Sequence, residues 1–314
     1  MMVKVLEAVP NFSEGRDLAK VRGVVDVIAR AGVEVLDWSA DPDHHRSVVT
    51  YIGDPSRVEA ASLAAARYAL ECIDLRGHRG VHPRIGALDV LPFVPLEGLE
   101  MADAVASARR VGAEIARMGI PVFYYAMASR PPGRRLAELR RGGFEVFSDG
   151  FPEDRLPDEP PGALAPHPTA GATCVGARGV LLAWNVFVAG IDEEEAREIA
   201  AIIRESGGGF VGLRALGLHL PRQDRVQISM SLEDPVGTDP LEVLAAIHRE
   251  VEARGGRVVE TEVVGMAPDT LVHPARVNRL ILPDLGPARV LSRRVAQHVQ
   301  GRISGRAEIS DSAE

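Results

Sequence analysis

The segment from Arg76 to Gly86 has the greatest density of chemically capable side chains in this chain of 314 residues. Its eleven residues, RGHRGVHPRIG, include two histidines, three arginines and three glycines, and an apolar run typical of a strand follows directly. A histidine accepts and donates protons near neutral pH, and an arginine binds anions through a planar set of donors. This segment is therefore the first candidate for a catalytic site.

His82 is the residue of this segment that could act in proton transfer. Pro83 restricts the backbone of His82, and Gly80 lets a ligand or another backbone segment come close. Arg79 and Arg84 flank His82. We expect their charges to lower its pKa and keep it neutral, as a general base requires. The pattern alone is equally compatible with a loop histidine that only packs.

Two other kinds of site have weak support. His78 and His82 have the spacing of zinc ligands on a helix, but Pro83 and the neighbouring glycines disfavour a helix there. The glycine-rich stretch 207–212 follows a predicted helix and precedes a predicted strand, which is the reverse of the order in a dinucleotide-binding motif. We expect neither a metal ion nor a nicotinamide cofactor.

The bulk composition narrows the class of protein. The net charge of −8 argues against general nucleic-acid binding, and no apolar run is long enough to span a membrane. The N-terminal residues lack the layout of a signal peptide, and Cys72 and Cys174 lie in apolar surroundings, so we expect reduced cysteines in a cytoplasmic protein. All but two of the 36 basic residues are arginine, so only local context can assign an arginine to a site.

The hydrophobic pattern predicts two halves with the same order of elements. Residues 3–96 and residues 180–264 each have the pattern β-α-β-β-α-β, which is the ferredoxin-like split motif. Helices on one face of a sheet leave the other face free, so two such units can line a cleft. We predict an α+β fold of duplicated ferredoxin-like subdomains with a cleft between them. Strands are predicted at residues 3–10, 33–37, 47–53, 87–96, 121–126, 180–188, 215–220, 226–232 and 258–264, and helices at 17–31, 55–74, 102–118, 132–141, 193–206, 240–254 and 287–299.

Two segments fall outside this pattern. The proline-rich stretch from Gly143 to Thr169 is either a linker or a long functional loop. The polar tail from Gly301 is predicted to be disordered. The predicted units are therefore an N-terminal subdomain at 1–178, a C-terminal subdomain at 179–300 and a tail at 301–314.

Three longer motifs resemble one known family. VPNFSEGR at 9–16, GHRGVHPRIGALDVLPF at 77–93 and GATCVGAR at 171–178 together resemble the formiminotransferase family, whose animal members are fused to a cyclodeaminase. The resemblance extends over both halves, to about residue 295. It implies transfer of the formimino group of N-formimino-L-glutamate to N5 of tetrahydrofolate in histidine breakdown, a duplicated ferredoxin-like fold and a homodimer.

The resemblance also implies roles for individual residues. The family's catalytic histidine falls on His82, which would act as general base and acid. Tetrahydrofolate would be a co-substrate. The family's folate-contacting loop falls on Gly162, Ala163, Leu164, Ala165, Pro166, His167, Pro168, Thr169, Ala170 and Gly171.

The chemistry of the two substrates suggests further contacts. Both carry glutamate carboxylates, so we assign Arg46 and Arg84 to bind them. The amidine of the donor is cationic, and we expect a carboxylate near it, with Asp37, Asp41 or Asp89 as candidates. The remaining predicted substrate contacts are Asn11 and Glu14, on a loop expected to face the cleft, and His45.

Two alternatives use small-molecule partners of the same kind. The first is formyl transfer between glutamate and 5-formyltetrahydrofolate, since the same residues could handle either donor. The second is a non-catalytic module that binds folate or an amino acid, for which loss of His82 would change nothing measurable. Comparing both donors in turnover assays separates these possibilities.

Overall fold

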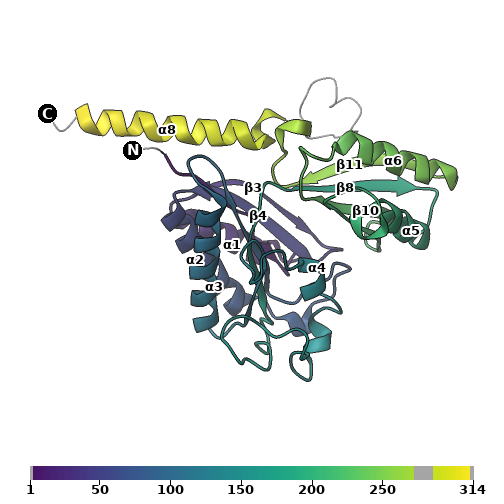
Figure 1. The fold of residues 1–314 in the computed structure, drawn as a ribbon, viewed down its shortest axis with the longest axis horizontal. Coiled ribbons are helices and arrows are strands. Elements are labelled where there is room, and N and C mark those ends of the chain that lie inside the picture. Colours follow the sequence, from purple (N-terminus) through teal and green to yellow (C-terminus); the bar gives the residue numbers. More distant parts are fainter. Residues whose placement is uncertain (1–2, 272–285, 312–314) are drawn as a thin grey trace.

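Two β-sheets, one in each half of the chain, form the framework of the protein (Figure 1). The computed structural model describes residues 3–271 and 286–311. It confirms the mixed composition of helices and strands that the hydrophobic pattern predicts. In the part of the chain described, no helix combines the length and apolar character needed to cross a membrane.

The first half is built on a seven-stranded sheet. The edge strand β3 pairs with β4, and β4 pairs with both β1 and β2, which also pair with β5. These pairs are antiparallel, whereas β7 joins β5 and β6 in parallel. In chain order the elements are β1 (Leu6–Ala8), β2 (Asn11–Phe12), α1 (Leu18–Arg30), β3 (Glu34–Asp41), β4 (Arg46–Gly53), α2 (Pro55–Cys72), β5 (Leu88–Pro95), α3 (Met101–Arg117), β6 (Val122–Ala126), α4 (Leu136–Leu139) and β7 (Thr173–Ala177).

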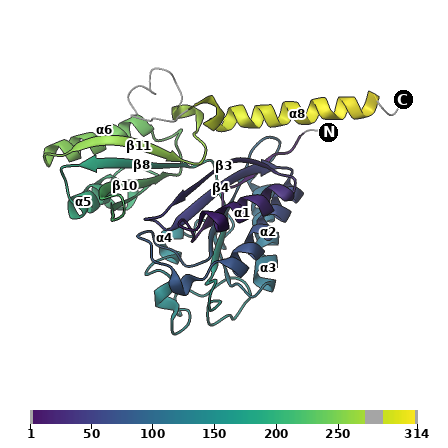
Figure 2. The same ribbon diagram turned by 180° about the vertical axis from the view of Figure 1, so that it is seen from behind.

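Helices α1, α2 and α3 cover one face of this sheet (Figures 1 and 2). The carboxylate of Asp17 accepts hydrogen bonds from the first-turn amides of α1, and Pro55 at the first turn of α2 has a backbone angle suited to that position. The buried alanines of α2 pack closely against the sheet, and Tyr51 and Phe93 are fully buried beneath the helices. This core fixes the positions of β4 and β5, and both strands contribute residues to the candidate site.

The proline-rich segment is part of the first half rather than a linker between halves. Phe147 and Phe151 pack with Phe123 of β6, with ring centroids 6.5 and 5.5 Å from that ring. The backbone also pairs with β6, since the Val122 amide donates to the Glu159 carbonyl at 2.7 Å. Only the short stretch 178–181 separates β7 from the first strand of the second half.

The second half has four antiparallel strands in the order β11-β8-β10-β9. Helices α5 and α6 pack on one face around Trp184, Ile199 and Ile247. Asp192 and Glu195 form a capping box at the start of α5. The elements of this half are β8 (Leu182–Ala189), α5 (Glu193–Ile203), β9 (Leu213–Leu220), β10 (Arg225–Leu232), α6 (Pro240–Ala253), β11 (Arg257–Val264) and α8 (Leu291–Asp311). Short 3₁₀ helices occur in the first half at Leu75–Gly77 and Phe144–Phe147, and in the second half at Glu205–Gly207, Asp269–Leu271 and Pro287–Arg289.

Several sequence predictions need correction. The pattern did not predict β7 as a strand, because its small residues show no alternation of apolar and polar side chains. Gly176 is needed there, since a Cβ atom would lie 2.4 Å from the Tyr125 ring. Strand β3 extends to Asp41, into a stretch expected to be a loop, because β4 offers it a partner as far as Arg46.

The C-terminal tail was also predicted incorrectly over most of its length. Helix α8 continues to Asp311, so residues 301–311 are helical rather than disordered, while 312–314 lie outside the described residues. The helix projects past the sheet of the first half in both views (Figures 1 and 2). Its first part is attached to β3, because Glu34 accepts hydrogen bonds from Arg294 at 2.8 Å and His298 at 2.7 Å.

Candidate active site

His82 lies in the loop between the 3₁₀ turn Leu75–Gly77 and β5, so it shares no helix face with His78, as predicted. Its Nδ1 hydrogen-bonds to the Pro83 carbonyl at 2.8 Å. Because a carbonyl can only accept, this contact places a proton on Nδ1 and leaves the lone pair of Nε2 available. The residue as a whole keeps some exposed surface, although its imidazole is surrounded closely enough for burial to affect its pKa. His82 therefore has the tautomer of a base that accepts a proton at Nε2.

The surroundings keep His82 neutral, but not through the arginines that the sequence indicated. Burial and the charges of Arg46 and Arg140, with a contribution from His44, hold the pKa of His82 well below its usual value. The predicted direction is therefore confirmed. The prediction that Arg79 and Arg84 cause the shift is wrong, because the positive charges that lower this pKa are those of Arg46 and Arg140.

A buried ion cluster of Asp89, Arg46 and Arg140 lies near His82. Asp89 has no exposed surface, and its Oδ2 accepts from Arg46 at 2.7 Å and from Arg140 at 3.1 Å. Its Oδ1 accepts from the Ile85 amide at 2.8 Å. Burial alone would raise the pKa of Asp89, but the two arginines hold it below its usual value. Asp89 thus fixes both arginines whose charges keep His82 neutral.

Arg140 also reaches the group that orients His82. Its Nη1 donates to the Pro83 carbonyl at 3.4 Å, the same oxygen that accepts from His82 Nδ1. On the other side of the cluster, Arg46 Nε donates to Asn11 Oδ1 at 3.1 Å. The predicted contacts Asn11, Arg46 and Asp89 are therefore connected to one another, and Arg140 joins them although the sequence offered no specific signal for it.

Arg84, predicted to bind a substrate carboxylate, already holds one from the protein. Its two terminal nitrogens donate to Glu145 at 2.7 and 2.5 Å in a bidentate pair. The Arg84 side chain is 9% exposed, whereas that of Glu145 is 62% exposed. Arg84 is thus held in a buried position, whereas Glu145 belongs to a segment at the surface.

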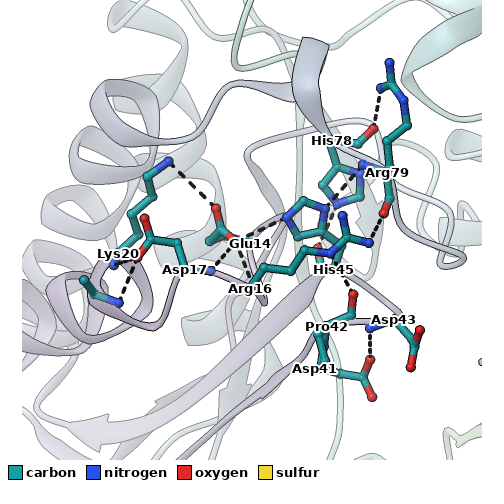
Figure 3. Close-up of polar contacts among 11 residues, drawn as sticks. Glu14, Arg16, Asp17, Lys20, Asp41, Pro42, Asp43, His45, His78 and Arg79 are labelled. Carbon is teal, nitrogen blue, oxygen red and sulfur yellow. Dashed lines mark hydrogen bonds and ion pairs between the residues drawn. The ribbon is translucent and has the colours of Figure 1, made fainter. Parts of the chain in front are cut away.

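A second polar cluster lies beside the His82 loop (Figure 3). Glu14 accepts from His45 Nε2 at 3.2 Å and from the backbone amides of Arg16 and Asp17 at 2.9 and 3.0 Å. Burial alone would raise the pKa of Glu14, but these hydrogen bonds lower it to about 2. Lys20 adds a weaker contact at 3.9 Å. Glu14 is therefore ionised and anchored to the turn that carries His45.

His78 has a structural role that the sequence prediction missed. Its ring stacks on that of His45 with centroids 4.2 Å apart, and its Nε2 donates to the His45 carbonyl at 2.8 Å. Burial lowers the pKa of His78 to about 4, so it is neutral at physiological pH. The Arg79 amide donates to His45 Nδ1 at 3.3 Å. The His82 loop is thus fastened to the turn between β3 and β4, in part through His78.

The end of the predicted folate loop lies against both ends of the His82 segment. The Leu75 amide donates to the Thr169 carbonyl, and the Ala87 amide donates to the Ala170 carbonyl, each at 2.8 Å. Gly171 has a φ of +69°, and a Cβ atom there would lie 2.0 Å from the Ile85 carbonyl. The earlier part of the loop is more open, with Leu164 73% exposed.

Asp37 is separate from these clusters. Its side chain lies 3.8 Å from Arg289, and burial raises its pKa. Among the described residues, no group of three or more histidine, cysteine or carboxylate side chains could hold a metal ion. Both cysteines are free, Cys174 buried and Cys72 partly buried.

The second half contacts the His82 loop directly. Val81 packs against Phe187, Leu218 and Leu220 of the second sheet. The turn between β3 and β4 adds polar contacts, with Asp43 accepting from the Arg222 amide at 2.8 Å and His44 Nε2 bonding to Gln227 Oε1 at 3.0 Å. His44 in turn lies 5.6 Å from His82 between ring centroids. The second half therefore contacts two neighbours of the candidate base, Val81 and His44.

A cavity of about 860 Å³ lies elsewhere between the halves. Leu96, Val180, Val236, Leu291 and Val295 contribute to its apolar lining. None of the site residues described above lines it. The arrangement around His82, rather than this cavity, combines an unprotonated base with charged groups and contacts to both halves.

Comparison with known proteins gives one consistent family. A model described as "Formiminotransferase domain, N-terminal subdomain" matches residues 5–178, and one described as "Formiminotransferase domain" matches residues 183–277. A glutamate formimidoyltransferase of Streptococcus pyogenes is 39% identical over 85% of this chain and 90% of its own length. One of Thermoplasma acidophilum is 36% identical over 93% and 98%, and the pig formimidoyltransferase-cyclodeaminase is 36% identical over 85% and 51%.

Proposed function

Because this chain belongs to the formiminotransferase family, we propose that it transfers the formimino group of N-formimino-L-glutamate to N5 of tetrahydrofolate. The products are 5-formiminotetrahydrofolate and glutamate, as in histidine degradation. The strongest support is that this chain covers nearly all of two relatives named glutamate formimidoyltransferase. Tetrahydrofolate is the co-substrate in this reaction, and a reaction without a metal ion stays a prediction from the sequence.

His82 serves as base and then as acid in the proposed mechanism. The lone pair of N5 attacks the formimino carbon, and the electrons of the carbon–nitrogen double bond move to its nitrogen. Nε2 of His82 takes the proton that N5 loses and delivers it to the glutamate nitrogen. The imino nitrogen then returns its electron pair to the carbon, so the carbon–nitrogen double bond re-forms as the bond from the carbon to the glutamate nitrogen breaks. The neutral state of His82 and its Nδ1 contact with Pro83 support this role.

Arg46 and Arg84 are the proposed partners of the substrate carboxylates. For Arg84 this requires that the carboxylate replaces Glu145, whose exposed side chain offers the same chemical group. Asp89 is buried with both oxygens occupied, so we propose that it acts by holding Arg46 rather than by touching the cationic amidine. In this proposal Asn11, Glu14 and His45 hold the neighbouring loops of the site in position. Asp37 is a less favoured candidate for contact with the cationic amidine.

The proposed architecture is two ferredoxin-like subdomains, at 1–178 and 179–300, with the substrates in a cleft between them. The two strand orders support it, since β3-β4-β1-β5 and β9-β10-β8-β11 place the elements of each half in the same sequence across the sheet. Folate would contact residues 162–171, whose end is bonded to the His82 segment. The homodimer and the cytoplasmic location expected from the sequence stay predictions.

Turnover of the purified protein tests the proposed function. With N-formimino-L-glutamate and tetrahydrofolate we expect 5-formiminotetrahydrofolate to accumulate, followed by its ultraviolet absorbance and by mass spectrometry. A parallel reaction offers glutamate and 5-formyltetrahydrofolate. Turnover in the second reaction alone would assign formyl transfer instead, and binding of folate without any turnover would leave a non-catalytic module.

Replacement of the base tests the mechanism. We expect His82→Ala to lose about 10²–10⁴-fold in kcat while the dissociation constants of both substrates stay close to wild type. His248, a partly exposed residue of α6 in the second half, provides a matched control as His248→Ala. Activity of His82→Ala near the wild-type level would make His82 a structural residue.

A further inference from the structure

Gln227 on β10 is a buried polar side chain with one half of its amide unused. The residue has no exposed surface, and its Oε1 is bonded to His44 Nε2 at 3.0 Å. Its amide nitrogen has no hydrogen-bond partner among the described residues. A buried donor left without an acceptor is destabilising, and an apolar side chain of the same size would avoid this cost. The position therefore favours a glutamine for a reason other than stability.

The strand register places Gln227 on the face of the second sheet that meets the His82 loop. Gln227 lies directly opposite Phe187 on β8 and Leu218 on β9, and residues that pair in this way share a face of the sheet. Phe187 and Leu218 pack against Val81, the residue before His82. The neighbouring Ile228 points to the opposite side, into the core beneath α5 and α6.

His44 fixes the orientation of the Gln227 amide. Its backbone amide donates to Asp41 Oδ1 at 2.7 Å, and its side chain is held in a buried position within the same turn. Because the His44 Nε2–H donates to Gln227 Oε1, the amide nitrogen must be turned away from His44. The same ring lies 5.6 Å from that of His82 between centroids. One histidine thus links the orientation of Gln227 to the position of the candidate base.

We infer that Gln227 binds substrate, donating a hydrogen bond from its amide nitrogen to a carbonyl or carboxylate oxygen, and that His44 is its positioning residue. This inference deepens the proposed function and rests on it. An amide suits a place beside a neutral base, since it donates to an oxygen without bringing a charge next to His82. The second half would then supply a specific contact to the reaction centre, in addition to covering it.

Direct binding measurements test this role. We expect Gln227→Met, which has a similar shape but no donor, to raise the dissociation constant of one substrate about tenfold in calorimetric titrations, with a smaller effect on the other. Separate titrations with N-formimino-L-glutamate and tetrahydrofolate show which molecule provides the oxygen. Asn185→Leu is the matched control, because Asn185 is a buried amide on the same sheet whose nitrogen already donates to Glu262 at 3.1 Å. We expect it to lower the melting temperature and leave both dissociation constants unchanged.

Two further variants separate binding from structure. Gln227→Glu keeps an acceptor for His44 and replaces the donor by an oxygen, so it should weaken the same substrate at least as much as Gln227→Met. His44→Gln retains a donor towards Gln227, so it should bind the affected substrate more tightly than His44→Phe does. Wild-type dissociation constants in both Gln227 variants would overturn the inference. If the wild-type protein itself binds neither substrate, the proposed function fails and the inference fails with it.

Discussion

At the scale of single residues, the candidate site is a neutral histidine next to a buried ion cluster with a net positive charge. Asp89 accepts hydrogen bonds from both Arg46 and Arg140, but its single negative charge balances only one of the two positive charges. Their field disfavours a third positive charge on the histidine ring. The Pro83 carbonyl then selects the tautomer with a free Nε2.

The dependence of kcat/KM on pH at acidic pH should depend on the charges that lower the pKa of His82. In the proposed mechanism His82 acts as a base when it is unprotonated, so kcat/KM should fall as the pH drops through its lowered pKa. Arg140→Gln removes one of the charges that lower this pKa, and we expect the acid limb of the profile to move to higher pH. Arg141→Gln is the control, because Arg141 is exposed and pairs only with Asp154. If the acid limb of the kcat/KM profile lay at the same pH in wild type and in Arg140→Gln, protonation of His82 would not be the cause of that limb.

The pair of Arg84 and Glu145 makes a separate prediction about substrate binding. An ion pair with one exposed partner contributes at most about 1 kcal/mol, so its removal costs little stability. If substrate carboxylate and Glu145 compete for Arg84, then Glu145→Gln should lower KM for one substrate by up to about fivefold at unchanged kcat. Glu153→Gln, another exposed change in the same proline-rich segment, should leave KM alone. An unchanged KM in Glu145→Gln would remove Arg84 from the list of carboxylate-binding residues.

At the scale of elements, the site is made by loops that are tied to one another at the end of the first sheet. The turn between β3 and β4 supplies Asp43, His44 and His45, and the loop before β5 supplies His82. His45 has a φ of +49°, an uncommon conformation for a residue with a side chain, and its contacts with Glu14 and His78 hold it there. Close contact between the two loops is what brings His44 near His82.

Two glycines of the His82 loop test how much this contact matters. A Cβ atom on Gly80 would lie 2.2 Å from the His44 carbonyl, whereas one on Gly77 would meet nothing within 4 Å. Gly80→Ala should push the loops apart and reduce kcat/KM by about 10–100-fold, because small displacements of a catalytic group are costly. Gly77→Ala should behave as wild type in the same assay. Equal activities would show that the loops can separate without harm.

At the scale of the whole molecule, the second half completes the site of the first. The hairpin between β9 and β10 reaches Asp43, whose Oδ2 also accepts from Gln223 at 3.3 Å. The backbone carbonyl of Asp43 accepts from the Val81 amide at 3.0 Å. A single turn thus contacts the second half through its side chain and the His82 loop through its backbone.

Loss of the Asp43 side chain should therefore loosen the halves and lower activity together. In Asp43→Ala we expect faster hydrogen exchange at the backbone amides of residues 221–224 and a stability loss of about 1–3 kcal/mol, since the Arg222 amide loses its acceptor. Mass spectrometry of peptides from this hairpin measures the exchange. Arg222→Ala removes an exposed side chain but keeps the backbone donor, and it should exchange as wild type does. Slow exchange in Asp43→Ala would show that apolar packing alone holds the halves together.

The sequence by itself indicated the β-α-β-β-α-β order of the main elements in each half and the segment that carries the candidate base. Apolar periodicity depends on neighbours a few residues apart, so α1, α2, β5 and α6 could be predicted close to their observed positions. The density of histidine, arginine and glycine before β5 marked His82, and the resemblance of three motifs to a known family indicated its role.

Only the tertiary structure decided which groups surround that base. Gln227 lies 183 residues from His44, and Arg140 lies 51 residues from Asp89, so no local pattern could join them. Strand β7 was missed for the same reason, because its small residues suit a place between two strands rather than a pattern of their own. Hydrogen bonds and charge interactions act over a few ångströms in space. The fold alone therefore brought residues of the second half into contact with Val81 and His44, which lie beside His82.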